Sequence, residues 1–145
     1  KPHVVLHHPS DCGNVGTILR TALGFGMEDV ALIRPCVDIF DPRVVRASMG
    51  AVFRTQVITT TWEEARQRCT AAGIPIAVTA LDTQAVDIRQ ADVGTMAAVI
   101  GSEGQGVRRE ILDAADKKLI IPMNPHCESL NAAVAAAIVM WQMKN

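Results

Sequence analysis

The chain has 145 residues, of which 49% are hydrophobic and 20% charged, a composition typical of one compact globular domain and not of a disordered chain. Its net charge of −1 does not by itself indicate a nucleic-acid binder, and no apolar run reaches the roughly 18 residues of a membrane span. Four scattered cysteines, with neither a CxxC pair nor metal-ligand spacing, favour reduced thiols in a cytoplasmic protein, and we expect no metal site.

Short apolar runs alternate with helical patterns along the whole chain. Runs rich in Val, Ile and Leu predict strands at residues 3–8, 29–33, 56–59, 74–80, 96–100 and 118–121. Their residues alternate little between apolar and polar, as in strands that are covered on both faces. Helices are predicted at residues 15–25, 61–72, 107–115 and 129–143. The pattern favours a single α/β domain, residues 1–145, with a mostly parallel sheet and helices on both faces.

The first predicted helix follows directly on the first strand and begins with polar residues. Asn14 suits a helix N-cap. Gly16 and Arg20 are four residues apart and therefore share one face of that helix. Arg20 would then lie near the carboxyl end of a strand, where open α/β sheets bind ligands. A guanidinium there could hold a phosphate or act on a ribose hydroxyl, although for this residue alone a surface arginine is the simpler interpretation.

A basic segment comes next. Residues 42–62 contain Arg43, Arg46 and Arg54 and no acidic residue. A local basic face can bind phosphate even on a protein of low net charge. On charge alone, an ordinary solvated face is the favoured interpretation.

A glycine-rich segment, Ile100-Gly-Ser-Glu-Gly-Gln-Gly-Val107, joins a predicted strand to a predicted helix. Three glycines in six residues would let the backbone approach a ligand closely. The GxxGxG spacing is neither the dinucleotide fingerprint nor a P-loop, which counts against NAD and ATP. The acidic Glu103 between the glycines makes a simple tight connection a less satisfactory explanation.

A polar segment precedes the last helix. Residues 121–131 contain two prolines and bring Glu128, Ser129 and Asn131 to the start of that helix. Polar groups at a helix start act as caps or as ligand contacts, and here they can do both.

The last helix is itself apolar on all sides. One stripe consists of Leu130, Val134, Ile138 and Trp141, and alanines fill much of the remaining surface. Such a helix is normally buried all round. We expect one side to pack on the sheet and another on a second subunit, with a purely intramolecular core helix as the alternative.

Taken together and in this order, the three segments resemble the signature motifs of the SpoU family within the SPOUT methyltransferases. The first motif reads Asn14-x-Gly16-x-x-x-Arg20-x-Ala22, and the second covers residues 100–106. The third reads Ile121-Pro-Met123, followed by Glu128-Ser-Leu-Asn131. The segment Arg46-Ala-Ser-Met-Gly-Ala51 also resembles the TrmH-like branch. Each motif alone is weak, but the ordered set is specific and covers nearly the whole chain.

The resemblance implies a deep trefoil knot near the C-terminus, a homodimer, and S-adenosylmethionine-dependent methylation of a ribose 2′-hydroxyl in rRNA or tRNA. The cofactor would contact, largely through backbone, Thr79, Ala80, Gly101, Gly104, Ile121, Met123 and Leu130. The catalytic residues would be Asn14, Arg20, Glu103, Ser129 and Asn131. Since a guanidinium stays charged, we expect Arg20 to orient the hydroxyl and stabilise the developing alkoxide. Arg43, Arg46 and Arg54 are candidates for phosphate contacts.

Many family members carry an RNA-binding domain before the catalytic one. We therefore expect that an N-terminal substrate-recognition segment lies outside this sequence. Only 3% of the residues are aromatic and none is Tyr, so the chain has few side chains on which bases could stack.

Two alternatives remain: a non-catalytic RNA-binding or assembly protein that retains the fold, and a different nucleotide-binding α/β enzyme.

Overall fold

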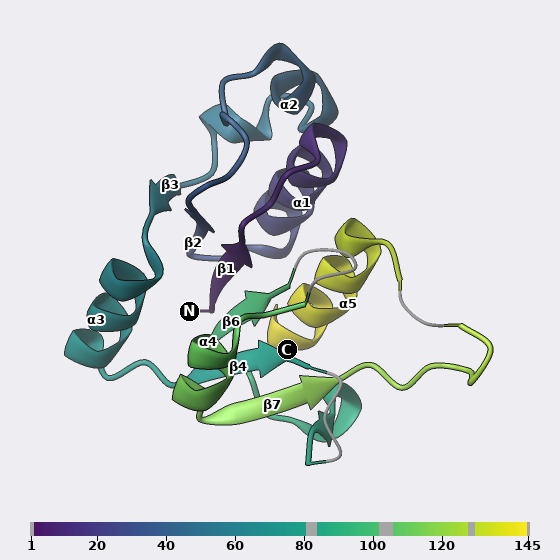
Figure 1. Ribbon diagram of the computed structural model, residues 1–145. Helices are drawn as coiled ribbons and strands as arrows, with labels where there is room; N and C mark the ends of the chain where they lie inside the picture. Colours follow the sequence, from purple (N-terminus) through teal and green to yellow (C-terminus); the bar gives the residue numbers. More distant parts are fainter. Residues whose placement is uncertain (1, 81–83, 102–105, 128–129, 145) are drawn as a thin grey trace.

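A computed structural model of the chain describes residues 2–80, 84–101, 106–127 and 130–144 (Figure 1). These residues form a seven-stranded sheet in which every pair of neighbours is parallel. The order is β3-β2-β1-β6-β4-β7-β5. The strands are β1 (His3–His7), β2 (Asp29–Ile33), β3 (Val57–Thr60), β4 (Ile76–Thr79), β5 (Val86–Asp87), β6 (Ala97–Ile100) and β7 (Lys117–Ile120). The six predicted strands are confirmed, whereas the two-residue β5 is too short to leave a pattern in the sequence.

The helices of the described residues are α1 (Cys12–Phe25), α2 (Pro42–Ala47), α3 (Trp62–Ala72), α4 (Arg109–Ala114) and α5 (Ala132–Lys144), with short 3₁₀ turns η1 (Ala51–Phe53) and η2 (Ile88–Gln90). The four predicted helices correspond to α1, α3, α4 and α5. Helix α2 was not predicted, because its six residues are too few to show a helical period. Its signal was Asp41 before Pro42, because a capping acid followed by proline is a common helix start. None of the described helices is long and apolar enough to cross a membrane.

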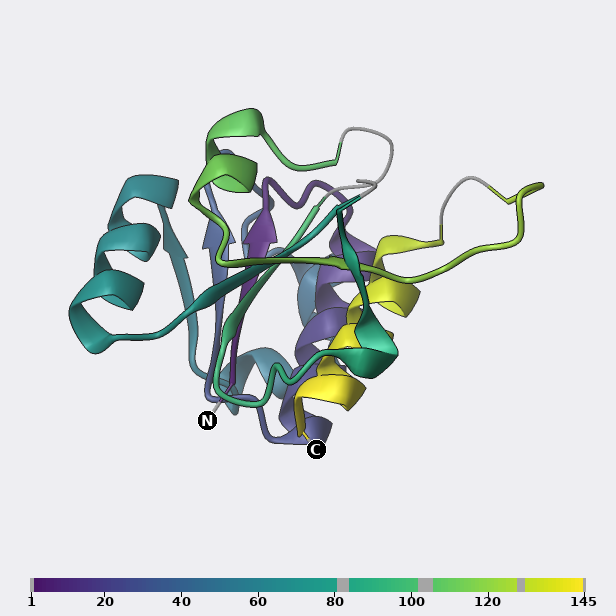
Figure 2. The same ribbon diagram turned by 90° about the horizontal axis from the view of Figure 1, so that it is seen from below.

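The helices cover both faces of the sheet, as predicted. Figure 2 shows α1 and α5 side by side on one face and α3 and α4 on the other. Successive residues of a strand point to opposite faces, so Val4 and Leu6 pack with α1 and α5 while Val5 packs with α3 and α4. This arrangement leaves the carboxyl ends of the strands accessible to a ligand.

The start of α1 differs from the prediction. The helix begins at Cys12, and its N-cap is Asp11, whose Oδ1 accepts the Asn14 N–H at 2.8 Å. The assignment of Asn14 as N-cap was therefore wrong. An N-cap side chain accepts an N–H two or three residues further on, and Asp11 offers this acceptor one turn earlier than Asn14 could. As a consequence, the Asn14 side chain is available for other contacts.

Candidate active site at the carboxyl ends of the strands

The parallel sheet brings the three motif segments to neighbouring strand ends. The first segment follows β1, and the second follows β6, which pairs with β1 so that Leu6 lies opposite Ile100. The third follows β7, which is separated from β6 only by β4. The chain leaves β1 towards β2 on one side, and β6 lies on the other. Such a reversal of strand order is where open α/β sheets bind their ligands.

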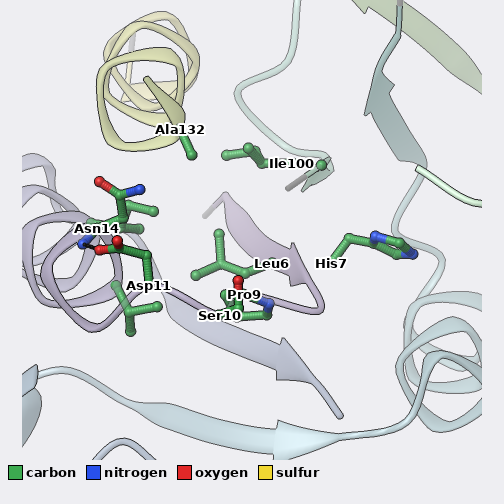
Figure 3. A pocket seen from close by; sticks show the side chains of 11 residues that line it. Leu6, His7, Pro9, Ser10, Asp11, Asn14, Ile100 and Ala132 are labelled. Carbon is green, nitrogen blue, oxygen red and sulfur yellow. Dashed lines mark hydrogen bonds between the residues drawn. The ribbon is translucent and has the colours of Figure 1, made fainter. Parts of the chain in front are cut away.

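A cavity of about 250 Å³ lies at this reversal. Its lining residues come from the ends of β1 and β6 and the starts of α1 and α5: Leu6, His7, Pro9, Ser10, Asp11, Asn14, Val15, Ile18, Ile100, Gly101 and Ala132. Figure 3 shows Leu6 and Ile100 as apolar walls, with Asn14 and Asp11 on one side and Ala132 above. Polar groups therefore converge on a mostly apolar hollow, an arrangement typical of ligand sites.

A larger hollow, of about 480 Å³, lies at the opposite ends of the strands. It is lined by β1, β2 and α3, and by residues such as His3, Asp29 and Arg68. None of the motif residues that the structure describes lines it, so we assign the candidate site to the smaller cavity.

A hydrogen bond between two asparagines connects the first and third motifs. Asn131 Nδ2 donates to Asn14 Oδ1 at 3.2 Å, although the two residues are 117 positions apart. Asn131 Oδ1 in turn accepts the N–H groups of Ala133 at 2.8 Å and Val134 at 3.3 Å. Asn131 thus caps α5 and contacts α1, and two of the predicted catalytic residues do lie together.

The glycine of the first motif allows α2 to lie against the first turns of α1. A Cβ on Gly16 would stand 2.5 Å from Ala47 Cβ, 2.7 Å from the Val44 carbonyl oxygen and 2.8 Å from the Ser48 nitrogen. These distances leave no room for a side chain. The close packing of α2 on α1 therefore explains why the motif has glycine at position 16, without reference to any ligand.

Arg20 lies apart from Asn14. It is exposed, does not line the cavity, and no hydrogen bond or ion pair joins its guanidinium to another described residue. Six residues of helix place the two side chains on different faces, about 9 Å apart along the axis. The described residues therefore do not bring Arg20 to the cavity.

Part of the predicted cofactor-binding set gathers at the ends of β4 and β6. The Thr79 hydroxyl donates to the Val99 carbonyl at 3.4 Å and accepts the Gly101 N–H at 3.5 Å. The Ala80 N–H donates to the Leu119 carbonyl at 2.9 Å, which joins this group to β7. A Cβ on Gly101 would stand 3.0 Å from Val107 Cγ2 and from the Gly106 carbonyl carbon, so glycine is needed for the close approach of these chains.

The structure describes three of the four remaining predicted cofactor-binding residues. Ile121 packs against the core on the α1 and α5 side, and Met123 and Leu130 are half-buried. Residues 122–127 project outward from the body in both views (Figures 1 and 2). The predicted site residues Glu103, Gly104 and Ser129 lie outside the described residues.

The basic residues divide into paired and unpaired groups. Asp41 accepts hydrogen bonds from Arg43, and the resulting ion pair spans 3.0 Å. These bonds lower the pKa of Asp41 to about 2. Arg46 and Arg54 are exposed and form no ion pair with a described residue. Of the three predicted phosphate contacts, Arg43 is therefore already partly neutralised.

His7 is a buried polar residue whose role the sequence did not reveal. It ends β1, is 4% exposed, and neither ring nitrogen has a hydrogen-bond partner among the described residues. Burial, followed by nearby His8 and Arg108, lowers the pKa of His7 to about 4. Its imidazole points away from Asn14 in Figure 3. The described residues contain no cluster of three metal-binding side chains around which His7 could act as a ligand.

An open parallel sheet with polar groups at its strand reversal defines an α/β protein whose candidate ligand site lies at the carboxyl ends of its strands. Comparison with known families is more specific: residues 1–141 match the model of the SpoU rRNA Methylase family. The chain belongs to this family.

Similar proteins agree with this membership. The 23S rRNA (guanosine(2553)-2′-O)-methyltransferase RlmP of Bacillus subtilis is 33% identical over 136 residues, which cover 92% of this chain and 54% of that protein. An AdoMet-bound rRNA methyltransferase from Sinorhizobium meliloti superposes with a TM-score of 0.93 at 31% identity, over 99% of this chain and 56% of the other. An RNA 2′-O ribose methyltransferase gives a TM-score of 0.89 at 29% identity, over 97% and 54%. The chain spans about half the length of the curated relatives it matches.

Proposed function

We propose that the chain is the catalytic domain of a cytoplasmic RNA methyltransferase that transfers a methyl group from S-adenosylmethionine to a ribose 2′-hydroxyl in rRNA or tRNA. The observation that carries the proposal is the hydrogen bond between Asn14 and Asn131, which joins the first and third family motifs at the strand reversal. The similarity to proteins named as 2′-O-methyltransferases supports the choice of acceptor. The family fold also leads us to propose the C-terminal trefoil knot.

The residues at the ends of β4, β6 and β7 fit S-adenosylmethionine. They bring together the Thr79 hydroxyl, the backbone at Ala80 and the close backbone approach at Gly101. We assign Ile121, Met123, Leu130 and Gly104 to the same pocket from their motif positions. The bound cofactor would supply an activated methyl group, so the chain's own task is to place the acceptor hydroxyl.

Arg20 is the residue to which we assign the acceptor. Its guanidinium has no partner among the described residues, so its donors are available to the substrate. It would hold the 2′-hydroxyl for attack and stabilise the negative charge that grows on the oxygen as its proton leaves. Asn14 and Asn131 would fix the walls of the site, and we include Glu103 and Ser129 because of their motif positions.

The separation of Arg20 from the cavity favours a site completed by a second subunit. On α5, the side with Ala136 and Met140 is buried, while Val134, Ile138 and Trp141 form an exposed apolar stripe. Trp141 is 53% exposed even though it contacts Phe25. A second copy that covered this stripe would bury apolar surface and bring its own α1 towards the site.

The homodimer is tested by a charge in the stripe. Ile138→Glu should leave the monomer folded, since Ile138 is 36% exposed, but should prevent its association. Sedimentation velocity should give a dimer for the unaltered chain and a monomer for the variant. An unaltered chain that sediments as a monomer at high concentration would remove this part of the proposal.

The activity is tested through Arg20. With radiolabelled S-adenosylmethionine and bulk rRNA or tRNA that lacks the modification, Arg20→Ala should abolish methyl transfer while calorimetry shows nearly unchanged cofactor binding. Arg68→Ala is the matched control, because Arg68 is an exposed arginine on α3 without an ion pair among the described residues. Unchanged turnover in Arg20→Ala would refute the role of Arg20. Failure of the unaltered chain to bind S-adenosylmethionine would favour the alternative of a non-catalytic RNA-binding protein.

A further inference from the structure

The exposed large hydrophobic side chains of the described residues form two groups, with Val86 apart from both. One group is the α5 stripe. The other lies on the segment that contains α2 and η1 and consists of Phe40, Met49 and Phe53. Phe40 is 62% exposed and Phe53 67% exposed, so two of the three phenylalanines of the chain lie on the surface. Exposed aromatic side chains that lie close together mark binding surfaces more often than isolated ones.

The two rings are stacked on each other, and we call this exposed pair the platform. Their centroids are 6.4 Å apart and their planes differ by 23°, so the rings are nearly parallel. The backbone holds both in place: the Phe40 N–H donates to Asp38 Oδ1 at 2.9 Å, and the Phe53 N–H donates to the Gly50 carbonyl at 3.1 Å. The aromatic faces are thus presented to solvent by an ordered turn on one side and an ordered helical turn on the other.

Charged residues of both signs lie close to the platform in sequence: Arg46 and Arg54, but also Asp38 and Asp41. Arg46 lies in α2, six residues after Phe40, and Arg54 is next to Phe53 in sequence. Neither arginine forms an ion pair with another described residue. The α5 stripe differs in this respect, because Lys144 is its only charged residue between Ala132 and Lys144. An apolar protein surface could cover the α5 stripe, but on the α2 segment it would remove two guanidinium groups from water, of which Arg46 has Asp41 nearby and Arg54 has no ion pair among the described residues. Aromatic faces beside cations match a single-stranded nucleic acid, which offers flat bases and phosphates.

The platform is also close to the candidate site. Since α2 packs directly on the first turns of α1 at Gly16, it lies beside the helix that carries Asn14 and Arg20 (Figure 1). A nucleotide held there would be a near neighbour of the ribose that Arg20 addresses. Although the chain has few aromatic residues, Phe40 and Phe53 therefore lie on the surface beside the helix that carries Arg20.

We propose that Phe40 and Phe53 form a stacking platform for an unpaired base of the RNA substrate, with Arg46 and Arg54 contacting the phosphates on either side of it. This inference rests on the proposed function for the identity of the substrate as RNA. It adds that the substrate is single-stranded beside the methylated nucleotide, since a base within a duplex has no free face to offer.

The test uses the full chain and a fluorescein-labelled single-stranded RNA dodecamer, with the matching RNA duplex as a second probe. Phe53→Leu should weaken binding of the single strand roughly five- to 150-fold, the usual effect of losing one base–aromatic contact. Phe53→Trp should retain the affinity, because it keeps an aromatic face. Phe40→Leu and Phe40→Trp should repeat this contrast, and the duplex should bind weakly to all of them. Arg46→Gln should weaken binding and reduce its salt dependence, whereas the control Arg68→Gln should not.

Equal affinities for the Leu and Trp variants would overturn the proposal, since a merely apolar contact tolerates both. A change in self-association at unchanged RNA affinity would also overturn it, by making the platform a contact between copies. Thermal melting and cofactor binding should be the same in all variants, because both rings are exposed. If the chain transfers methyl groups normally and the Leu variants keep their RNA affinity, the platform is refuted and the proposed function stands. If the unaltered chain transfers no methyl group but the Leu variants lose RNA affinity, the platform is supported and the proposed function is refuted.

Discussion

Substitution of Gly16 by alanine measures how tightly α2 is packed on α1. The new Cβ would meet three atoms within 2.5–2.8 Å, two of which belong to the backbone of α2 and cannot rotate away. Alanine gains about 1 kcal/mol over glycine in a helix interior. Overpacking costs about 1–3 kcal/mol, and the backbone contacts place this case near the upper end. We expect a net loss of about 2 kcal/mol and a melting temperature lower by about 4–8 °C.

Gly24 provides the matched control in the same helix. A Cβ there meets nothing within 4 Å, so Gly24→Ala should raise the unfolding free energy by up to about 1 kcal/mol. Urea denaturation of both variants should show opposite shifts of the midpoint at an unchanged slope. Adding Ala47→Gly to Gly16→Ala should recover part of the loss, because Ala47 Cβ is the nearest atom. A Gly16→Ala variant as stable as Gly24→Ala would refute the packing argument.

Three further predictions concern the cap, the buried histidine and the thiols. Asn131→Ala should lower the unfolding free energy by about 1 kcal/mol in urea denaturation because α5 loses its cap, whereas Asn131→Asp, which keeps an acceptor, should not; equal losses would contradict the capping role. The folded pKa of His7 is about 4 against 6.5 when unfolded, so the unfolded chain binds more protons between these values. The stability that depends on neutral His7 is therefore present above pH 6.5 and lost as the pH falls towards 4, about 2 kcal/mol of it between pH 7 and pH 5. His7→Phe should remove this part of the pH dependence of the urea midpoint, and an unchanged dependence would argue against it. Finally, Cys127 should react first with a thiol reagent at pH 7.5, since it is exposed while burial raises the pKa of Cys36 and Cys69; a fast phase that survives Cys127→Ser would disprove this order.

Local features of the fold could be read from the sequence. The run at residues 29–33, which is apolar after Asp29, is a strand with those bounds, because the buried positions of a strand covered on both faces are apolar. The helix predicted at residues 61–72 is α3, and local signals set its ends: the Thr61 hydroxyl accepts the Glu64 N–H at 3.2 Å, and Gly73 adopts φ 68°. These signals depend on residues within one or two turns of each other. The alternation of strands and helices likewise indicated a parallel sheet, since parallel strands need crossover connections.

The assignment of the N-cap of α1 shows where local reasoning becomes ambiguous. Asp11 and Asn14 have nearly equal capping preference and stand three residues apart, so the sequence supports either start. The contacts of the rest of the chain decide between them. With Asp11 as cap, Gly16 can receive α2, and the Asn14 side chain is left for Asn131.

The sequence by itself determined which residues could do chemistry, where most helices and strands run, and, by the order of its motifs, the family to which the chain belongs. Only the tertiary structure decided which of those residues meet. It joined Asn14 to Asn131 across 117 positions, kept Arg20 away from both, and placed Phe40 and Phe53 together on the surface. The physical reason is that periodicity and capping are set by neighbours along the chain, whereas these contacts depend on strand order and on how closely two helices can pack.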